Sequence, residues 1–323
     1  HIITEIANLV AQLYFMALLL IRNNKEYQPW IDALQKADPT IEVVTPETIK
    51  DPEDATMAIT WKAPKGSYAK YPNLKVIGSM GAGVDHLFED ESLPEDVILT
   101  RVVDEKLASD MQEFVAALCL NHIRNLKTYA RLQQENTWKP TDYKRAKDVT
   151  AGILGFGTLG QAVGTMLKAI GFNVIGWSSS EKNVEGIKSY TEDELNTFLS
   201  KSEILVCLLP LTENTKGILN EELFNKLPQG AYLINVARGG HLVDDDLIEA
   251  LNSEHLSGAA LDVFHTEPLP EEHPFWQTEN IIITPHIASM SNAASVSGQV
   301  AENYQRMQNG EQLLNQVQAK KGY

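Results

Sequence analysis

The stretch Thr150-Ala-Gly-Ile-Leu-Gly-Phe-Gly-Thr-Leu-Gly160 decides how the rest of the chain can be interpreted. Residues 149–154 form a short apolar run without polar alternation, which predicts a buried parallel strand. Gly155, Gly157 and Gly160 follow at the spacing G-x-G-x-x-G. In this pattern the first glycine permits a tight turn, the second lets the backbone approach a pyrophosphate, and the third lets the next helix pack closely on the strand. The stretch therefore predicts a phosphate-binding turn.

The residues after the turn favour this interpretation over a chance cluster of glycines. Residues 161–170 have apolar side chains at helical intervals, and Gly171 is a typical helix stop. A second apolar run at 173–177 completes a strand–helix–strand unit of the kind that binds dinucleotides. The cofactor-binding candidates of this turn are Gly155, Gly157, Thr158, Leu159 and Gly160.

Composition argues against several classes of protein. The chain of 323 residues has 43 acidic and 27 basic side chains, and its net charge of −16 disfavours nucleic acid or an anionic membrane as partner. Cys119 and Cys207 lie in apolar runs, which favours buried thiols in a reduced, cytoplasmic protein, and no Cys/His cluster has metal-ligand spacing. The apolar stretch 13–21 is too short to span a bilayer. Residues 1–15 fit poorly with the strand pattern that starts at Met16, so we expect a leader added for expression before a natural start at Met16.

Alternating strand and helix patterns predict two α/β units. The first is expected to contain a helix at 27–37 and strands at 17–21, 41–45, 57–61, 74–80 and 97–102. The second is expected to contain six strands, at 149–154, 173–177, 204–209, 231–237, 258–263 and 281–284. This order is typical of Rossmann-like, doubly wound parallel sheets.

The positions of these patterns also predict how the domains are connected. Ser109-Asp-Met-Gln112 has the form of a capping box and opens a helical pattern over 110–134. A bridge between domains and a dimer face are both open interpretations of that helix. A last helix is expected at 292–308. Because the glycine turn lies in mid-chain, we expect the cofactor domain to be inserted into a split substrate or lid domain. The expected limits are 109–286 for the cofactor domain, and 16–108 with 287–323 for the lid domain.

Three charged side chains follow successive strands of the second predicted sheet. Arg238 comes after the fourth strand, Glu267 after the fifth and His286 after the sixth. The carboxyl ends of parallel strands meet at one edge, where ligands bind in such folds. An arginine can hold the carboxylate of a 2-oxo acid, a histidine can supply a proton, and a glutamate can orient and charge that histidine. Singly, each has a plainer interpretation as a loop cation, a turn residue or a helix cap; together they predict an acid–base site.

Several motifs resemble those of the D-isomer-specific 2-hydroxyacid dehydrogenases. They are Gly155-Phe-Gly-Thr-Leu-Gly160, Asn235-Val-Ala-Arg-Gly239, Leu261-Asp-Val-Phe264 with Glu267-Pro268-Leu269, and Thr284-Pro-His-Ile-Ala288. The resemblance extends from about Met16 to the end of the chain. Within the family, the group that reduces glyoxylate and hydroxypyruvate is most similar. The motifs shared with that group are Gly81-Ala-Gly-Val-Asp85, Met111-Gln-Glu113, Leu208-Leu-Pro210, Gly230-Ala-Tyr-Leu-Ile-Asn235 and Gln316-Val-Gln-Ala-Lys-Lys-Gly-Tyr323.

The resemblance implies an NAD(P)H-dependent enzyme that reduces a small 2-oxo acid such as glyoxylate or hydroxypyruvate to glycolate or D-glycerate. It implies that Arg238 binds the substrate carboxylate and carbonyl, that His286 is the proton donor and that Glu267 is its partner. The backbone amides of Ala82 and Gly83 are implied to help hold the carboxylate.

Further site residues follow from the same resemblance. Asp262 is implied to contact the nicotinamide carboxamide, and Leu209 and Pro210 are further cofactor-binding candidates. Trp61 and Trp138 resemble residues of the substrate pocket, and Trp138 could come from the second subunit of a homodimer. Core packing is an equally good account of either tryptophan.

The residues after the second strand of the glycine unit bear on the choice of cofactor. An NAD-specific site has an acidic side chain there, which accepts hydrogen bonds from the ribose hydroxyls. In this chain Ser178, Ser179 and Ser180 take that place, and Lys182 adds a positive charge that would attract a 2′-phosphate. Glu181 would oppose a phosphate if it pointed inward. The sequence therefore predicts NADP(H) as the preferred cofactor, with use of NAD(H) and an indifferent polar turn left open.

Two other functions stay open at this point. One is a dinucleotide-sensing regulator on the same fold, against which the presence of Arg238, Glu267 and His286 speaks. The other is a different dehydrogenase of the family, acting on a bulkier hydroxy acid, on formate or on phosphoglycerate. Formate oxidation needs no protonation of a carbonyl, so a Glu–His pair favours hydroxy-acid chemistry.

Overall fold

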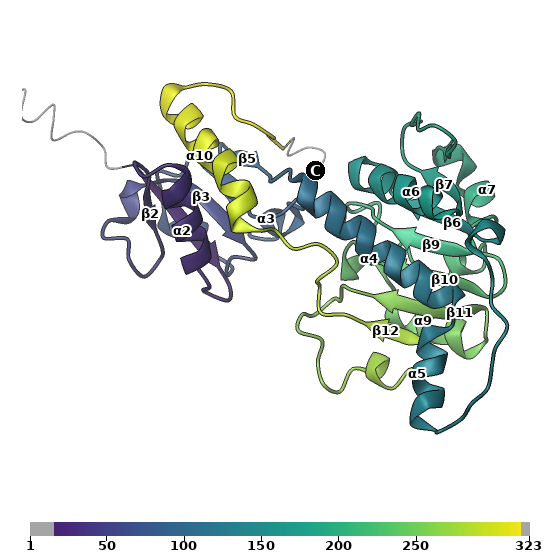
Figure 1. Cartoon of the computed structure of the whole chain (residues 1–323). Helices are drawn as coiled ribbons and strands as arrows, with labels where there is room; N and C mark the ends of the chain where they lie inside the picture. The colour runs from purple at the N-terminus through teal and green to yellow at the C-terminus, as the bar shows by residue number, and fades with distance from the viewer. Residues whose placement is uncertain (1–15, 318–323) are drawn as a thin grey trace, which may run out of the picture. The chain divides into compact units, whose positions relative to one another are not determined.

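The structure, a computed structural model, describes residues 16–317. The expected leader at 1–15, and 318–323 at the end of the expected lid domain, lie outside the described residues. The chain divides into two compact units, one formed by Glu105–Met290 and the other by the segments before and after it. The predicted α/β fold, with a dinucleotide-type domain inserted into a split domain, is confirmed (Figure 1). The expected domain limits stay a prediction, because compactness alone does not define which segments fold together.

The first unit contains a five-stranded parallel sheet. Its strands are β1 (Ala17–Arg22), β2 (Glu42–Val44), β3 (Ala55–Trp61), β4 (Val76–Ser79) and β5 (Ile98–Thr100), in the order β2-β1-β3-β4-β5. Its helices are α2 (Gln28–Ala37), α3 (Asp85–Phe88) and α10 (Ala293–Asn309). Successive residues of β1 are buried, as is typical of a parallel strand covered on both faces. Helix α10 packs on α2, so both ends of the chain build this unit (Figure 1).

The second unit contains a seven-stranded parallel sheet. Its strands are β6 (Thr150–Leu154), β7 (Asn173–Trp177), β8 (Lys188–Tyr190), β9 (Ile204–Cys207), β10 (Ala231–Asn235), β11 (Leu256–Leu261) and β12 (Ile281–Ile283), in the order β12-β11-β10-β9-β6-β7-β8. The chain order reverses between β6 and β9, and ligands bind at such a switch point. The expectation of six strands omitted β8, because its sequence Lys-Ser-Tyr contains no apolar run.

The helices of the second unit differ from expectation at one place. They are α4 (Glu105–Ile123), α5 (Leu126–Gln134), α6 (Thr158–Ile170), α7 (Leu195–Leu199), α8 (Glu221–Phe224) and α9 (Asp244–Asn252). The predicted single helix over 110–134 is wrong, because Asn125 adopts a left-handed conformation with φ of 56° and separates α4 from α5. Asparagine tolerates this conformation, and its side-chain amide donates to the Thr141 hydroxyl at 3.1 Å and to the Asp142 carbonyl at 2.6 Å. Ser109 lies inside α4, so the predicted capping box does not begin the helix.

Both cysteines are buried and free, as predicted. Burial raises the pKa of the Cys119 and Cys207 thiols to about 12. Within residues 16–317, none of the helices combines the length and the apolar content that a membrane crossing requires.

Candidate active site

The glycine turn between β6 and α6 leaves space and donors for a phosphate group. Gly155 has φ of +108°, and a Cβ atom there would lie 2.5 Å from the carbonyl carbon of Leu208. A Cβ atom on Gly160 would lie 2.2 Å from the Gly155 carbonyl oxygen, so α6 approaches the turn closely. Among the described residues nothing lies within 4 Å of a Cβ atom on Gly157, and no side chain caps the N-terminus of α6. These residues fit the pyrophosphate of a dinucleotide, with the first amides of α6 as donors.

The loop after β7 brings a serine and a lysine together. In dinucleotide-binding folds, residues at this position contact the adenine ribose. The Lys182 ammonium donates to the Ser180 hydroxyl oxygen at 2.7 Å. The Ser178 hydroxyl donates to the Ser180 carbonyl at 2.8 Å, so it is engaged by the loop itself. Ser179 and Glu181 are exposed. The loop therefore offers a cation beside the Ser180 hydroxyl and an exposed Ser179, and the predicted cofactor contacts of the three serines stay a prediction.

Glu267 and His286 form the centre of the candidate site. Oε2 of Glu267 lies 2.8 Å from Nδ1 of His286, and both side chains are largely buried. The second carboxylate oxygen of Glu267 accepts a hydrogen bond from the Phe264 amide at 3.0 Å. His286 has φ of 56°, a conformation that is uncommon for a residue with a side chain and that often marks a functional site. The structure thus brings together two of the three predicted acid–base residues.

Asp262 holds the turn on which His286 lies. One of its oxygens accepts hydrogen bonds from the Thr284 hydroxyl at 2.6 Å and the Ile287 amide at 2.9 Å, and the other accepts one from the Ala288 amide at 2.9 Å. Asp262 is 1% exposed. These bonds make it an anchor of the turn, a role that the sequence did not indicate. The implied contact of Asp262 with a nicotinamide stays a prediction.

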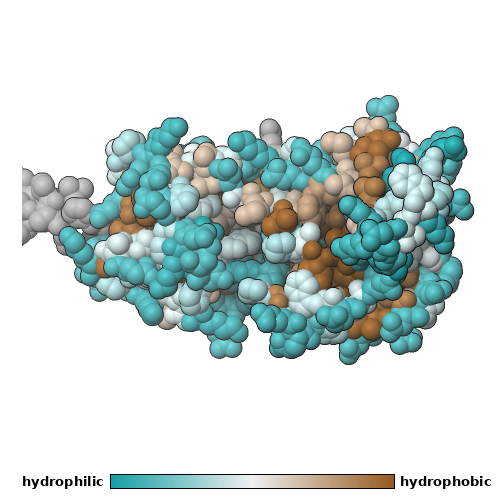
Figure 2. All heavy atoms as spheres, turned by 60° about the horizontal axis from the view of Figure 1, so that its bottom comes forward, coloured by the Kyte–Doolittle hydropathy of each residue, from teal (hydrophilic) through white to brown (hydrophobic). Residues whose placement is uncertain are grey.

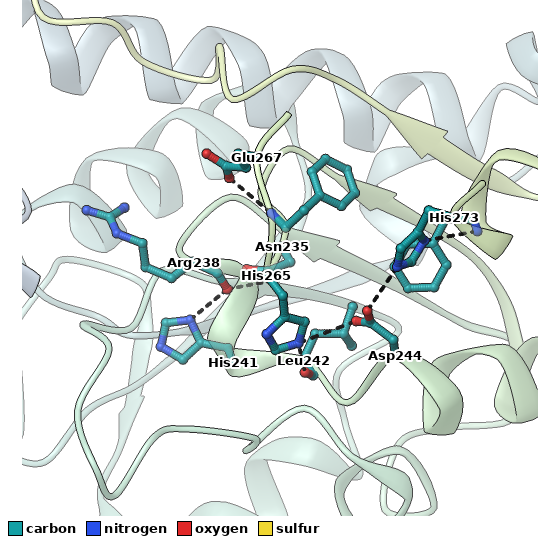
Figure 3. Close-up of polar contacts among 10 residues, drawn as sticks. Asn235, Arg238, His241, Leu242, Asp244, His265, Glu267 and His273 are labelled. Carbon is teal, nitrogen blue, oxygen red and sulfur yellow. Dashed lines mark hydrogen bonds and ion pairs between the residues drawn. The ribbon is translucent and has the colours of Figure 1, made fainter. Parts of the chain in front are cut away.

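Arg238 follows β10 at the start of a short turn. Its guanidinium donates to the Ala237 carbonyl at 2.7 Å, and its own carbonyl accepts a hydrogen bond from the Asn235 amide at 3.0 Å. His241 is fully buried, and its Nδ1 lies 3.1 Å from the Arg238 carbonyl oxygen (Figure 3). Its Nε2 lies 3.2 Å from the Pro210 carbonyl oxygen. His241 is thus buried, although histidines in loops are more often surface residues. The apolar residues directly after it were the only signal of burial.

The Arg238 turn also packs directly on the segment that contains Glu267. A Cβ atom on Gly239 would lie 2.0 Å from the Phe264 carbonyl carbon and 2.4 Å from the His265 nitrogen. Only glycine allows this close approach. The loops that contain Arg238 and Glu267 therefore meet at the carboxyl edge of the sheet, as the sequence predicted.

The first unit contains its own cluster of predicted site residues. The Gly81–Gly83 turn follows β4 and is held by Ser79, whose hydroxyl donates to the Gly83 carbonyl at 2.6 Å and accepts from the Gly81 amide at 3.1 Å. The ring of Trp61 covers Gly81 so closely that a Cβ atom there would lie 2.6 Å from it. The Trp61 ring lies 4.9 Å from the ring of His86. Ala82 is half-buried in this turn.

Trp138 lies in the segment after α5 and is 100% exposed. The alternative that it packs in the core of this chain is therefore wrong. Leu209, by contrast, is buried after β9, and Pro210 beside it is exposed.

The sheet order, the glycine turn and the Glu–His pair define a dinucleotide-binding α/β protein with an acid–base site. Residues 116–288 match the family model described as D-isomer specific 2-hydroxyacid dehydrogenase, NAD binding domain. The chain belongs to the D-isomer specific 2-hydroxyacid dehydrogenase family, which confirms the resemblance found in the sequence.

Individual relatives are similar over most of their length. The glyoxylate/hydroxypyruvate reductase A of Serratia proteamaculans (strain 568) is 42% identical over 279 residues, which cover 84% of this chain and 89% of that protein. A D-isomer specific 2-hydroxyacid dehydrogenase from Xanthobacter autotrophicus Py2, solved with NADPH and MES, has a TM-score of 0.89 at 39% identity and covers 95% of this chain and 99% of its own. An NADPH-dependent glyoxylate/hydroxypyruvate reductase from Sinorhizobium meliloti, solved with NADP and sulfate, has a TM-score of 0.89 at 37% identity. The match covers 95% of this chain and 100% of that chain.

Proposed function

We propose that this protein is an NADPH-dependent reductase of small 2-oxo acids, which converts glyoxylate to glycolate and hydroxypyruvate to D-glycerate. The single observation that supports this most directly is the hydrogen bond of 2.8 Å between Glu267 and His286 at the carboxyl edge of the sheet. Relatives of about 40% identity that are named for this activity support the choice of substrate.

In this proposal, separate residues of the chain donate the proton, stabilise the proton donor and bind the substrate. When bound, a reduced nicotinamide supplies the hydride that adds to the carbonyl carbon. His286, as an imidazolium, protonates the carbonyl oxygen. Glu267 accepts a hydrogen bond from the ring and stabilises its charged form. Arg238 binds the carboxylate and polarises the carbonyl, so negative charge on the oxygen develops beside a fixed cation.

The remaining predicted residues bind and orient. The amides of Thr158, Leu159 and Gly160, at the start of α6, hold the pyrophosphate, and Gly157 leaves room for it. Lys182 supplies a charge for the 2′-phosphate of NADPH, with NADH as the weaker alternative. The cofactor contacts of Gly155, Ser178, Ser179, Ser180, Leu209, Pro210 and Asp262 belong to the same proposal.

The substrate is expected to be small. The amides of Ala82 and Gly83 are donors for a carboxylate in this proposal, and Trp61, which covers the Gly81 turn, limits the space beside them. Glyoxylate and hydroxypyruvate should therefore have higher kcat/KM values than phenylpyruvate, with pyruvate as a further small acid for comparison.

Absorbance of the reduced nicotinamide tests the proposal when the protein is mixed with NADPH and each of these four acids. Fast oxidation with glyoxylate and hydroxypyruvate is the expected result. A preference for phenylpyruvate would instead indicate a dehydrogenase of bulkier hydroxy acids. Tight binding of NADPH without turnover of any acid would favour the dinucleotide-sensing regulator.

A homodimer in a reducing, cytoplasmic compartment completes the proposal. Exposed apolar side chains gather on α4, α5 and the segment after them; they are Leu120, Leu126, Tyr129, Trp138 and Tyr143. Beside them is a hollow of about 590 Å³ lined by Ala117, Asn121, Leu126, Lys127, Ala130, Ile281 and Ile282. Figure 2 shows brown apolar surface on the second unit.

A second copy would cover this surface and bring its Trp138 to a neighbouring site. Light scattering tests this proposal. We expect the wild type to have the mass of a dimer and Leu126→Glu to have the mass of a monomer.

A further inference from the structure

A group of titratable side chains outside the proposed chemistry contacts the segment that contains Glu267. Asp244 is the first residue of α9, and its carboxylate lies between two imidazole rings (Figure 3). Nε2 of His265 lies 3.6 Å from Oδ1, and Nε2 of His273 lies 3.3 Å from Oδ2. We call these three residues the Asp244 clasp. Neither they nor other described His, Cys, Asp or Glu residues form a group of three that could hold a metal ion.

The other hydrogen bonds of the two histidines determine where their protons lie. The Phe275 amide donates to Nδ1 of His273 at 3.3 Å, so Nε2 has the proton and donates to Asp244. Nε2 of His265 lies 2.8 Å from the Leu242 carbonyl oxygen, which can only accept, so this nitrogen is also protonated. His265 therefore donates its Nε2 proton to Leu242 and contacts Asp244 by proximity of charge at 3.6 Å, whereas the Nε2 proton of His273 points toward Asp244.

The position of Asp244 on α9 distinguishes it from its neighbours. Its side chain is 26% exposed, and burial raises its pKa, while the two histidines act in the opposite direction. Asp245 is exposed. Asp246 accepts a hydrogen bond from the Glu221 amide at 2.8 Å and so ties α9 to the start of α8. In the described structure, Asp244 is the acidic residue of this turn that contacts the segment between β11 and β12.

The clasp holds this segment at points on both sides of Glu267. His265 precedes Glu267 by two residues and His273 follows it by six. Glu267 lies between these points; the amide of Phe264, the residue before His265, donates to one of its oxygens, and the other oxygen contacts His286. The backbone of Phe264 and His265 is also the surface on which Gly239 packs. A shift of the segment would therefore move Glu267 and disturb the Arg238 turn.

We propose that Asp244 is a positioning residue, which acts through His265 and His273 to hold Glu267 against His286. This inference rests on the proposed roles of Glu267 and His286. Asp244 itself touches neither substrate nor cofactor in this proposal. Its removal should therefore reduce the rate of proton transfer and leave the binding of NADPH unchanged.

The test is the variant Asp244→Asn, with Asp245→Asn as the matched control on the same helical turn. Asp244→Asn keeps the shape of the side chain, but it removes the charge and one of the two acceptors. We expect kcat to fall about 10- to 100-fold, since small misplacements of acid–base groups have effects of this size. The KM for glyoxylate and the Kd for NADPH should change little. Asp245→Asn should behave as the wild type.

The pH profile separates a positioning role from a structural one. If Asp244 acts through Glu267, Asp244→Asn should shift the pH dependence of kcat in the same direction as Glu267→Gln. The fall in kcat caused by Asp244→Asn should also be much smaller in a Glu267→Gln background than in the wild type. A wild-type pH profile with normal kcat, or losses that multiply in the double variant, would overturn the proposal.

A second variant guards against misfolding. His265 is half exposed, so His265→Gln should fold even if Asp244→Asn does not, and it should show the same shift at smaller size. A wild-type pH profile in folded His265→Gln and His273→Gln would also overturn the proposal. If Glu267→Gln and His286→Ala retained full turnover, the proposed function itself would fail. If they lost turnover while Asp244→Asn did not, the clasp alone would fail.

Discussion

Nδ1 of His286 lies 2.8 Å from a carboxylate oxygen of Glu267, although the two residues follow different strands, β12 and β11. A carboxylate can only accept a hydrogen bond, so Nδ1 is protonated, and in the proposed reaction Nε2 is the nitrogen that exchanges a proton with the substrate. Asp262 fixes the turn beneath the ring through three hydrogen bonds. The imidazole is thus oriented by hydrogen bonds within the chain.

Replacement of His286 by alanine tests the proton donor. We expect His286→Ala to lose about 10²- to 10⁴-fold in kcat, the usual contribution of a general acid. The Kd for NADPH should stay within a few-fold, because the proposal places the ring at the substrate oxygen and not at the cofactor. Stopped-flow turnover and fluorescence titration of NADPH measure the two quantities. Unchanged kcat in the folded variant would refute the assignment.

Replacement of Glu267 by glutamine tests the pairing. In the proposed reaction His286 acts as an imidazolium, and a neutral amide in place of the Glu267 carboxylate does not stabilise that positive charge. Activity should therefore be lost at a lower pH than in the wild type, so that the alkaline limb of the kcat profile moves toward acid. An unshifted limb would count against the pair.

Much of the fold could be predicted because its signals are local. The run 149–154 and the glycines after it identify a strand and a turn from neighbouring residues alone. The break at Asn125 could not be predicted in this way, because it is stabilised by Thr141 and Asp142, which belong to a later segment. The edge strand β8 was missed because its three residues pair with β7 without being apolar.

The candidate site shows the same division. Arg238, Glu267 and His286 could be found because strand ends meet at one edge of a parallel sheet. His241 and the Asp244 clasp could not, since their roles depend on contacts with carbonyls and rings from other loops. Nothing in the local pattern around Asp244 separates it from Asp245 and Asp246.

The buried His122 predicts how stability depends on pH. Its ring stacks on Tyr232 at 4.0 Å, and burial, with a smaller effect of Lys144, lowers the pKa of His122 to about 4 from 6.5. Between these values the unfolded chain binds a proton that the folded chain does not. Stability is therefore retained above pH 6.5 and declines as the pH falls toward 4.

The variant His122→Phe should keep the stack and remove this part of the decline, which is on the order of 2 to 3 kcal/mol. Thermal melting near neutral pH and at about pH 5, between the two pKa values of the histidine, measures it. Both proteins should have similar melting temperatures near neutral pH, and the variant should lose less in acid. Equal losses would contradict the prediction.

The loop after β7 predicts the preference between NADPH and NADH. Lys182 and Ser180 lie together at 2.7 Å, and the exposed Glu181 is the one acidic side chain next to them in sequence. Lys182→Ala should reduce the ratio of kcat/KM for NADPH to that for NADH by about tenfold, the worth of one charge-assisted hydrogen bond. Glu181→Arg should raise the ratio.

Lys188→Ala is the matched control, because the Lys188 ammonium lies over the ring of Tyr190 at 4.4 Å and should not affect the ratio. A clear preference of the wild type for NADH would contradict the role of Lys182. It would leave the proposed roles of His286 and Glu267 untouched, because the proposal assigns them to the substrate and not to the adenine ribose.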